Sequence, residues 1–185
     1  MLQVNFSPFP IIETSRLLLR RIDRNDVPAL FVMRSDTGMM RYIDRPLAQT
    51  PADAEELIDR IDLALENNDG ITWGVYLKNS PGLIGTIGYW RMVKEHYRAE
   101  IGYLLHEKLQ GRGLMQEAIA AIIDYGFNVM KLHSIEANVS PLNDASIKLL
   151  LKNNFVKEAH FRENYYFNGE FKDSIIYSLV NFGKS

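Results

Sequence analysis

Apolar and polar residues follow two different periods along the chain, and each change of period marks a boundary between a helix and a strand. Short apolar runs bounded by turn residues predict strands at residues 14–21, 71–77, 83–92, 99–105, 133–139, 155–161 and 175–180. Apolar positions spaced three or four residues apart predict helices at residues 25–33, 50–67, 114–129 and 143–152. Most strands follow one another without an intervening helix. The pattern therefore predicts a mixed α+β fold, with a mostly antiparallel sheet of six to seven strands and about four helices.

Local signals support these boundaries. Thr50, followed by Pro51 and then Asp53, is typical of a helix start, because a capping hydroxyl, an early proline and an acidic first turn all favour it. Residues 79–82, Asn-Ser-Pro-Gly, predict a turn between two strands. No repeat, low-complexity segment or linker interrupts the 185 residues, so we expect a single domain over residues 1–185.

The composition argues against several classes of site. The chain has no cysteine, which excludes a disulfide scaffold, a thiolate metal site and a cysteine nucleophile. The net charge of −2 gives no general basic surface, so no nucleic-acid partner is expected, and the arginines at positions 16, 20, 21 and 24 are interpreted as solvated. The four histidines show no metal-ligand spacing, so no metal is expected.

The sequence also lacks targeting and membrane signals. Its first twelve residues have no basic start and no continuous apolar stretch, unlike a signal peptide. No window approaches the roughly 18 apolar residues of a membrane helix. We therefore expect a cytoplasmic protein without a membrane partner.

The segment from Gln110 to Met115 carries the clearest chemical signal. Gly111 and Gly113 lie between a predicted strand and a predicted helix. Such glycines allow a tight turn, and the helix start that follows offers free N–H groups to a phosphate. An ordinary glycine turn before a helix has the same pattern, so both interpretations stay open here. The segment matches neither a P-loop nor a Rossmann dinucleotide fingerprint.

The order of elements and motifs resembles the GNAT superfamily of acetyl-coenzyme A-dependent N-acetyltransferases, and within it the RimJ/RimL-type branch, which acetylates the N-termini of ribosomal proteins. The resemblance spans roughly residues 14 to 180. It is carried by Thr14-Ser15-Arg16-Leu17-Leu18-Leu19-Arg20, Gln110-Gly111-Arg112-Gly113, Asn143-Asp144-Ala145-Ser146, Asn154-Phe155 and Asn168-Gly169-Glu170-Phe171-Lys172-Asp173-Ser174. It implies a splayed central sheet, with acetyl-coenzyme A as co-substrate.

The resemblance implies a cofactor site in three parts: a pyrophosphate loop with its helix start, a strand whose backbone pairs with the pantetheine arm, and contacts from a later strand and helix. The corresponding residues are Gln110, Gly111, Arg112, Gly113, Leu114 and Met115 in the loop, Leu104 and Leu105 in the strand, and Asn138, Asn143 and Ser146 after it. Met115 departs from the small residue usual at its position. Asn143 is also a favoured helix cap.

Catalysis is expected to depend on Glu100 and Ser146. Glu100 heads the strand that would carry the thioester, and a glutamate tuned by burial can act as a general base; alternatively it pairs with Arg98 or faces water. Ser146 would orient the sulfur or relay a proton, because Leu150 occupies the position where other branches have a tyrosine donor. Glu163 is a second carboxylate to test. Without cysteine, direct attack in a ternary complex is favoured.

The acceptor site is expected to use polar and aromatic side chains from loops and strands, namely Arg41, Tyr42, Trp73, Trp90, Tyr165 and Tyr166. A protein N-terminus is the first candidate acceptor. A small amine, such as a polyamine, an amino acid or an aminoglycoside, is the alternative, and a non-catalytic acyl-coenzyme A sensor is the second alternative. The resemblance is compatible with a homodimer.

Overall fold

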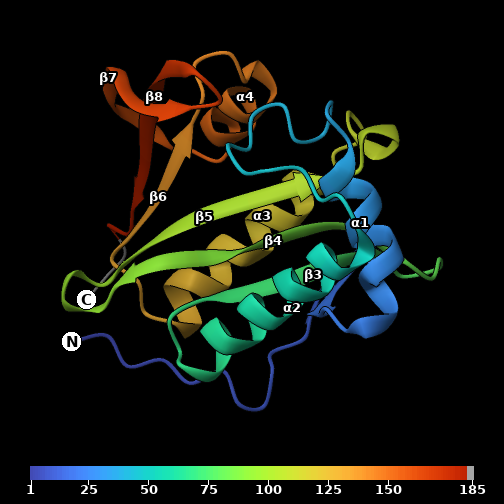
Figure 1. Cartoon of the computed structure of the whole chain (residues 1–185). Helices are drawn as coiled ribbons and strands as arrows, with labels where there is room; N and C mark the ends of the chain where they lie inside the picture. Colours follow the sequence, from blue (N-terminus) through green and yellow to red (C-terminus); the bar gives the residue numbers. More distant parts are fainter. Residues whose placement is uncertain (183–185) are drawn as a thin grey trace.

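The structure is a computed structural model that describes residues 1–182, and it is built around one eight-stranded sheet (Figure 1). The strands are β1 (Ile12–Glu13), β2 (Leu17–Arg21), β3 (Ile71–Leu77), β4 (Leu83–Val93), β5 (Arg98–Leu105), β6 (Ser134–Val139), β7 (Val156–Phe167) and β8 (Glu170–Val180). Their order is β1-β2-β3-β4-β5-β6-β8-β7, and every neighbouring pair is antiparallel except β5 and β6. The predicted mixed α+β fold with a mostly antiparallel sheet is confirmed. The two-residue strand β1 is too short to leave an apolar pattern.

Helices cover both faces of this sheet (Figure 1). They are α1 (Val27–Ser35), α2 (Pro51–Glu66), α3 (Leu114–Asp124) and α4 (Asp144–Lys152), with short turns η1 (Arg24–Asp26), η2 (Lys94–His96), η3 (Glu107–Leu109) and the π-helical η4 (Tyr125–Val129). Helices α1 and α2 lie over one face, and α3 lies over the other. The helix predicted over residues 114–129 is thus α3 continued by η4.

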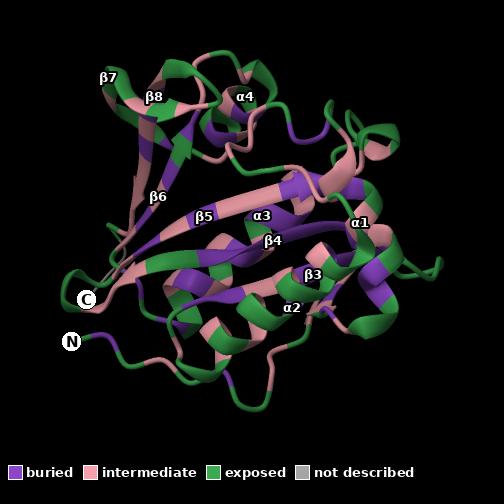
Figure 2. Cartoon of the chain, viewed as in Figure 1, coloured by how far each residue is buried: buried purple, intermediate pink, exposed green. Residues whose placement is uncertain are grey.

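Side chains of the central strands alternate between two apolar clusters, since successive residues of a strand point to opposite faces. Trp73, Ile87 and Ile101 belong to the cluster under α3. Tyr76 and Leu104 belong to the cluster under α1 and α2. Figure 2 shows the buried positions concentrated on the middle strands. Within residues 86–90 of β4 and residues 100–104 of β5, the even-numbered residues therefore face α1 and α2.

The start of α2 confirms its sequence signal. Thr50 and Asp53 form a capping box, and Pro51 is the first helical residue. Backbone N–H groups of Gln49 and Thr50 donate to the Asp53 carboxylate, which lowers the pKa of that group.

Strands β7 and β8 are longer than the apolar pattern predicts. They extend through residues 162–174, in which polar residues are mixed with aromatic ones, because the two strands pair across a tight hairpin. Its turn residues, Asn168 and Gly169, have φ values of 50° and 86°, as a type I′ turn requires. β7 lies at the edge of the sheet with most side chains exposed, so the sequence shows no buried period there.

Strands β5 and β6 pair over three residues and then separate. The ladder joins residues 98–100 to residues 134–136, and among the described residues no pairing between these strands continues beyond Glu100. β6 then follows β8, while β5 continues beside β4 (Figure 1). Residues 101–105 of β5 are left with a partner strand on one side only.

Candidate active site

The backbone N–H and C=O groups of alternate residues in β5 point toward the gap between β5 and β6. The His106 N–H donates to the Ile84 carbonyl on β4, so His106 and, by alternation, Leu104 and Gly102 direct their backbone groups at β4. The backbone groups of Tyr103 and Leu105 consequently face the open side. Of the two leucines expected to bind the cofactor, Leu105 offers its backbone to the gap, whereas Leu104 does not. The Leu104 side chain packs below α1 and α2 instead.

The glycine loop (residues 106–113) leads from this open strand to the start of α3. Gly111 and Gly113 have φ values of 73° and 72°, a left-handed conformation that favours glycine. A side chain added at Gly111 would meet no atom within 4 Å, so the space beside it is open. No side chain caps α3, whose N-cap is Gly113. The first-turn N–H groups and the positive end of the helix dipole are thus available to an anion, which fits a phosphate group.

The side chains of the first two residues of α3 do not cover the glycine loop. Leu114 and Met115 are 4% and 8% exposed and pack in the core under α3. The large Met115 side chain therefore does not lie over the loop. Gln110 donates from Nε2 to the Leu105 carbonyl at 3.0 Å, which ties the loop to the end of β5.

Arg16 holds the other side of the loop. Its guanidinium donates to the carbonyls of Arg112 and Gly113 at 3.0 and 3.1 Å, and its Nε lies 2.7 Å from Oε2 of Glu117. Arg16 is exposed, as expected of a solvated residue, but these contacts also give it a structural role. In the sequence, only the place of Arg16 in the motif at the start of the first predicted strand indicated a structural role.

Glu117, in the first turn of α3, collects four donors. They are the Thr14 and Ser15 hydroxyls, the Arg16 N–H and the Arg16 side chain. Partial burial acts to raise the pKa of Glu117, but these hydrogen bonds outweigh it and lower the pKa to about 2. The glycine loop is thereby fixed to the start of β2 by a charged hydrogen-bond network.

Ser146 and Tyr103 face each other across the gap between β5 and α4. Their hydroxyl oxygens lie 2.6 Å apart. Burial raises the pKa of Tyr103 to about 12, although the hydrogen bond to Ser146 acts in the opposite direction. The phenol therefore stays protonated near neutral pH. Sequence reasoning missed Tyr103, because no motif links a strand tyrosine to a helix serine 43 positions later.

The helix α4 sets the position of Ser146. Asn143 caps this helix by accepting the Ser146 N–H at 3.1 Å. Leu150, at the position where a tyrosine donor was considered, is 0% exposed and packs in the core. Asn138 is exposed on β6, opposite in direction to the buried Ala137 and Val139. Its role in cofactor binding stays a prediction.

Glu100 lies where the β5–β6 ladder ends. It is opposite Trp90 on β4 and beside Glu136 on β6. Its carboxylate is 3.0 Å from Nη1 of Arg91, whereas Arg98 pairs with Glu136 at 2.8 Å. The expected alternative of a pair with Arg98 is therefore wrong. Arg91 has a φ of 45° in an irregular part of the β4–β5 pairing, and such irregularities often re-aim side chains beside functional sites.

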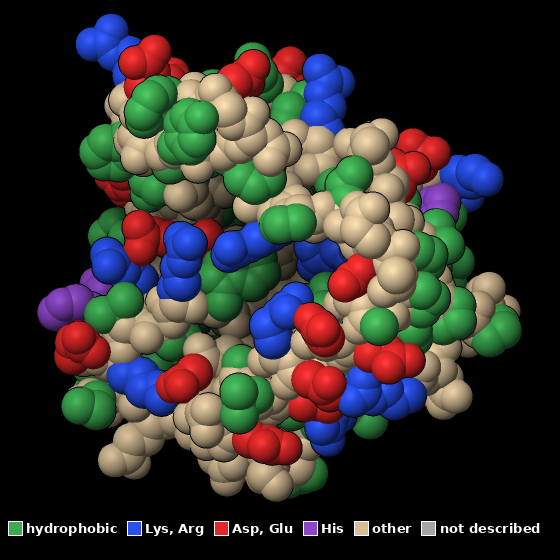
Figure 3. Space-filling model, in the orientation of Figure 1, with side chains coloured by type: hydrophobic (Ala, Val, Ile, Leu, Met, Phe, Trp, Pro, Cys, Tyr) green, Lys and Arg blue, Asp and Glu red, His purple; other side chains and the backbone are tan. Residues whose placement is uncertain are grey.

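A pocket adjoins Glu100 on the face of the sheet covered by α1 and α2. We call it the Trp90 pocket; its lining residues are Arg34, Leu57, Ile61, Thr72, Thr86, Ile87, Trp90 and Gly102. A Cβ at Gly102 would lie 1.8 Å from the Trp90 ring, so the ring rests directly on this glycine. Figure 3 shows that the molecule is hollowed over β4 and β5, with Lys and Arg side chains gathered at the edge of the hollow.

The residues expected to bind the acceptor are only partly brought together. Trp73 is 0% exposed, donates from its indole N–H to the Pro10 carbonyl at 2.7 Å and packs under α3. It belongs to the core, and its assignment to the acceptor site was wrong because the sequence does not tell which face of β3 it occupies. Trp90 lines the pocket.

Three of the remaining candidates, Arg41, Tyr42 and Tyr165, lie in or against the segment between α1 and α2. The guanidinium of Arg41 is 5.3 Å from the centre of the Tyr42 ring. Tyr165 donates to Asp44 at 2.6 Å, and Lys172 lies 3.1 Å from the same carboxylate, so β7 and β8 are tied to this segment. Burial and the Asp44 carboxylate raise the pKa of Tyr165. Tyr166 is exposed and packs edge-on against Phe171.

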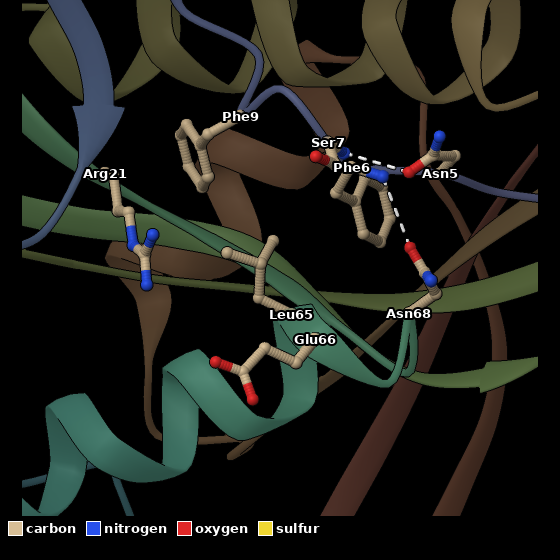
Figure 4. Close-up of a pocket in the computed structure, with 8 residues that line it drawn as sticks. All are labelled: Asn5, Phe6, Ser7, Phe9, Arg21, Leu65, Glu66 and Asn68. Atoms are coloured by element: carbon tan, nitrogen blue, oxygen red, sulfur yellow. Dashed lines mark hydrogen bonds between the residues drawn. The ribbon is translucent and has the colours of Figure 1, made fainter.

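A second pocket lies between the N-terminal segment and the end of α2 (Figure 4). Its lining residues are Asn5, Phe6, Ser7, Phe9, Arg21, Leu65, Glu66 and Asn68. The Phe6 N–H donates to the Asn68 side chain at 3.2 Å, which fastens the segment to the turn after α2. None of its lining residues belongs to β5, α3 or α4.

Comparisons with known proteins agree with this geometry. A sequence model described as the acetyltransferase (GNAT) domain matches residues 16–156. The chain belongs to the GNAT family of acetyltransferases. The uncharacterized N-acetyltransferase YoaA of Bacillus subtilis is 37% identical over 172 residues, which cover 93% of this chain and 97% of that protein.

Solved structures agree with the family. The ribosomal-protein-S5-alanine acetyltransferase of Vibrio fischeri matches with a TM-score of 0.82 and 26% identity, covering 94% of this chain and 97% of that one. RimL, a ribosomal L7/L12 α-N-protein acetyltransferase solved with coenzyme A, shares the fold with a TM-score of 0.84 and 22% identity, covering 92% and 98%. The expected resemblance is confirmed, and this GNAT acetyltransferase uses acetyl-coenzyme A as its acetyl donor.

Neither a metal cluster nor a membrane helix accompanies this site within residues 1–182. No three His, Asp or Glu side chains of this range are grouped so that they could hold a metal ion. No helix in the same range is long and apolar enough to cross a membrane.

The first prediction concerns the charged tie between the glycine loop and β2. Glu117→Gln should lower the free energy of unfolding at pH 7 by about 1–3 kcal/mol, because the carboxylate that gathers these donors is lost. The folded-state pKa of Glu117 is depressed, so its contribution is complete above the ordinary value of 4.5 and is lost as the pH falls toward about 2. Urea unfolding of both proteins at a series of pH values should show the difference shrinking over that range.

The exposed Glu56, which is 3.8 Å from Arg60 on α2, supplies the matched control. Glu56→Gln should change the free energy of unfolding by less than about 0.5 kcal/mol at every pH. A Glu117→Gln effect that is equal at pH 7 and pH 3 would contradict the depressed pKa.

Proposed function

We propose that this enzyme acetylates the N-terminal α-amino group of a protein or peptide, by direct attack on acetyl-coenzyme A in a ternary complex. The juxtaposition of Glu100, the open edge of β5 and the Trp90 pocket carries this proposal. Glu100 ends the β5–β6 ladder where the open edge of β5 begins, and it is opposite Trp90, which lines the pocket. The similarity to the ribosomal-protein-S5-alanine acetyltransferase of Vibrio fischeri supports an α-amino acceptor.

The donor would be held by residues of three elements. The uncapped start of α3 and the glycine loop would bind its pyrophosphate. The backbone groups of Tyr103 and the N–H of Leu105, which face the open edge, would receive its extended arm. When bound, acetyl-coenzyme A supplies a thioester whose acetyl group moves to the amine. Arg16 and Gln110 keep the loop in place for this task.

Glu100 would remove the proton from the attacking amine. An α-amino group has a pKa of about 7.7–8.0, so part of it is already unprotonated near neutral pH. A carboxylate then needs to accept only one proton from the attacking amine, directly or through a water. Arg91, paired with Glu100, holds the carboxylate in one orientation. Glu100 and Gly102 lie on the same face of β5, beside the ring of Trp90.

The Tyr103–Ser146 pair would serve the departing thiolate. Ser146 would stabilise the departing thiolate by donating a hydrogen bond to the sulfur, and the protonated Tyr103 hydroxyl would orient Ser146 by donating a hydrogen bond to it. This pair replaces the helix tyrosine of other branches, whose position is occupied by the buried Leu150.

The central experiment measures free-thiol release from acetyl-coenzyme A with a panel of acceptors, and locates the acetyl group by mass spectrometry. The panel contains peptides that begin with Ser, Ala or Asp, together with polyamines and free amino acids. Glu100→Gln should lower kcat at pH 7 by about 100-fold or more, within the range of general-base effects. At pH 9 the loss should be smaller, because the α-amino group is already deprotonated in solution.

Two further variants make this result specific. Glu170→Gln, at the exposed tip of the β7–β8 hairpin, should behave as the wild type. Loss of activity in Glu163→Gln but not in Glu100→Gln would move the base to β7. Tight binding of the cofactor without thiol release from any acceptor would replace the transferase by a sensor.

The hydroxyl pair gives a separate prediction. Tyr103→Phe should lower kcat by about 10- to 100-fold, because Ser146 loses its donor, and should leave the KM for acetyl-coenzyme A within about twofold. Steady-state kinetics check this, with Tyr97→Phe, at an exposed tyrosine outside the proposed site, as the control. An unchanged kcat in Tyr103→Phe would show that the phenol takes no part in thiolate release.

A further inference from the structure

Arg34 places an arginine side chain in the Trp90 pocket without an acidic partner. It lies in the last turn of α1 and lines the pocket together with Trp90 and Gly102. Its Nε is buried and has no hydrogen-bond acceptor among residues 1–182. Nη1 of Arg34 donates to the sulfur of Met40 at 3.8 Å, and no carboxylate of the described residues lies within 4.0 Å of its nitrogens.

The surroundings of Arg34 make its unpaired positive charge less favourable. Burial, followed by repulsion from Arg45 and Arg60, lowers the pKa of the Arg34 guanidinium to about 10. The group still carries its charge near neutral pH. Arg34 is half-buried, and a charge that is partly removed from water without an acidic partner is unfavourable in a folded protein. Arginines in such positions normally occur with a carboxylate or phosphate. The pocket therefore contains an arginine for which the described residues supply no anionic partner.

The two ends of the site have opposite charges. Glu100 lies at the end of the β5–β6 ladder, and Arg34 approaches the same face of the sheet from α1. Trp90 connects them, since it is opposite Glu100 in the sheet and lines the pocket with Arg34. Leu57 and Ile61 form an apolar wall between α2 and the sheet. This arrangement suits a ligand with an amine at one end and an anion at the other.

We propose that Arg34 binds a carboxylate of the acceptor, so that the enzyme selects primary amines that also carry a carboxylate group. The inference rests on the proposed acetyl transfer and specifies its substrate class. A guanidinium matches a carboxylate in two parallel hydrogen bonds, and Arg34 lines the pocket without a described carboxylate beside it. A polyamine would instead bring a second cation against a half-buried guanidinium, and like charges at close range repel. The carboxylate comes from an acidic side chain near a peptide N-terminus or from a free amino acid.

Matched pairs of acceptors test this selectivity and its source. The first pair is Ala-Asp and Ala-Asn at the start of otherwise identical peptides with amidated C-termini. The second pair is alanine and alaninamide, and spermidine is the cationic comparison. In the wild-type enzyme, at least one carboxylate member should have a kcat/KM about tenfold or more above its amide partner, as expected for a charge-assisted bidentate contact. The pair that shows the difference identifies the source.

Variants of Arg34 connect the selectivity to the residue. Arg34→Met should remove most of the preference by lowering kcat/KM for the carboxylate acceptor, with the KM for acetyl-coenzyme A within about twofold of the wild type. Arg34→Lys should keep part of the preference, since it retains charge but not the fork. The melting temperature of Arg34→Met should equal or exceed that of the wild type, because an unpaired half-buried charge is removed. Arg24→Met, which removes an exposed arginine paired with Asp59, is the control.

The outcomes separate this inference from the proposed function. Acetyl transfer that proceeds equally with carboxylate and amide acceptors, or that Arg34→Met slows equally for both, would overturn the role of Arg34 while acetyl transfer stands. A raised KM for acetyl-coenzyme A in Arg34→Met would assign the arginine to the donor and also overturn it. A complete absence of turnover with every acceptor would remove both proposals.

Discussion

The separation of β5 from β6 is the constraint on which the rest of the site depends. A strand with unpaired N–H and C=O groups offers itself to any extended partner. Here the pairing stops at Glu100 and Glu136, so the free edge begins where the candidate base lies. The alternation of backbone direction then decides that Tyr103 and Leu105, and not Leu104, face the opening.

Several contacts keep this edge open and directed at one ligand. β6 is taken up by its pairing with β8, and α4 packs Leu150 into the core while Ser146 reaches Tyr103. Arg16 and Glu117 fix the glycine loop at the end of the same strand. The donor site therefore consists mainly of backbone groups, held by side chains that do not themselves need to touch the ligand.

The sequence allowed the prediction of those parts that local chemistry determines. The capping box of α2, the turn at Gly111 and Gly113 and the placement of Ser146 behind a helix cap all follow from neighbouring residues. The tasks of Arg16 and Tyr103 could not be predicted, because their partners lie about 100 and 43 positions away in the chain. Trp73 was misplaced for a related reason: strands buried on both faces carry no apolar alternation that reveals which face a tryptophan occupies. The hairpin of β7 and β8 likewise forms by pairing, which apolar periodicity does not detect.

Residue-resolved amide hydrogen exchange, measured by NMR with and without coenzyme A, tests the central claim most directly. The account predicts that coenzyme A slows exchange at Tyr103 and Leu105, whose N–H groups face the gap, and at the first turn of α3. Exchange at Gly102 and Leu104 should already be slow without the cofactor, because β4 pairs with them. Slowed exchange at Gly102 and Leu104 with no change at Tyr103 and Leu105 would contradict the donor site described for β5.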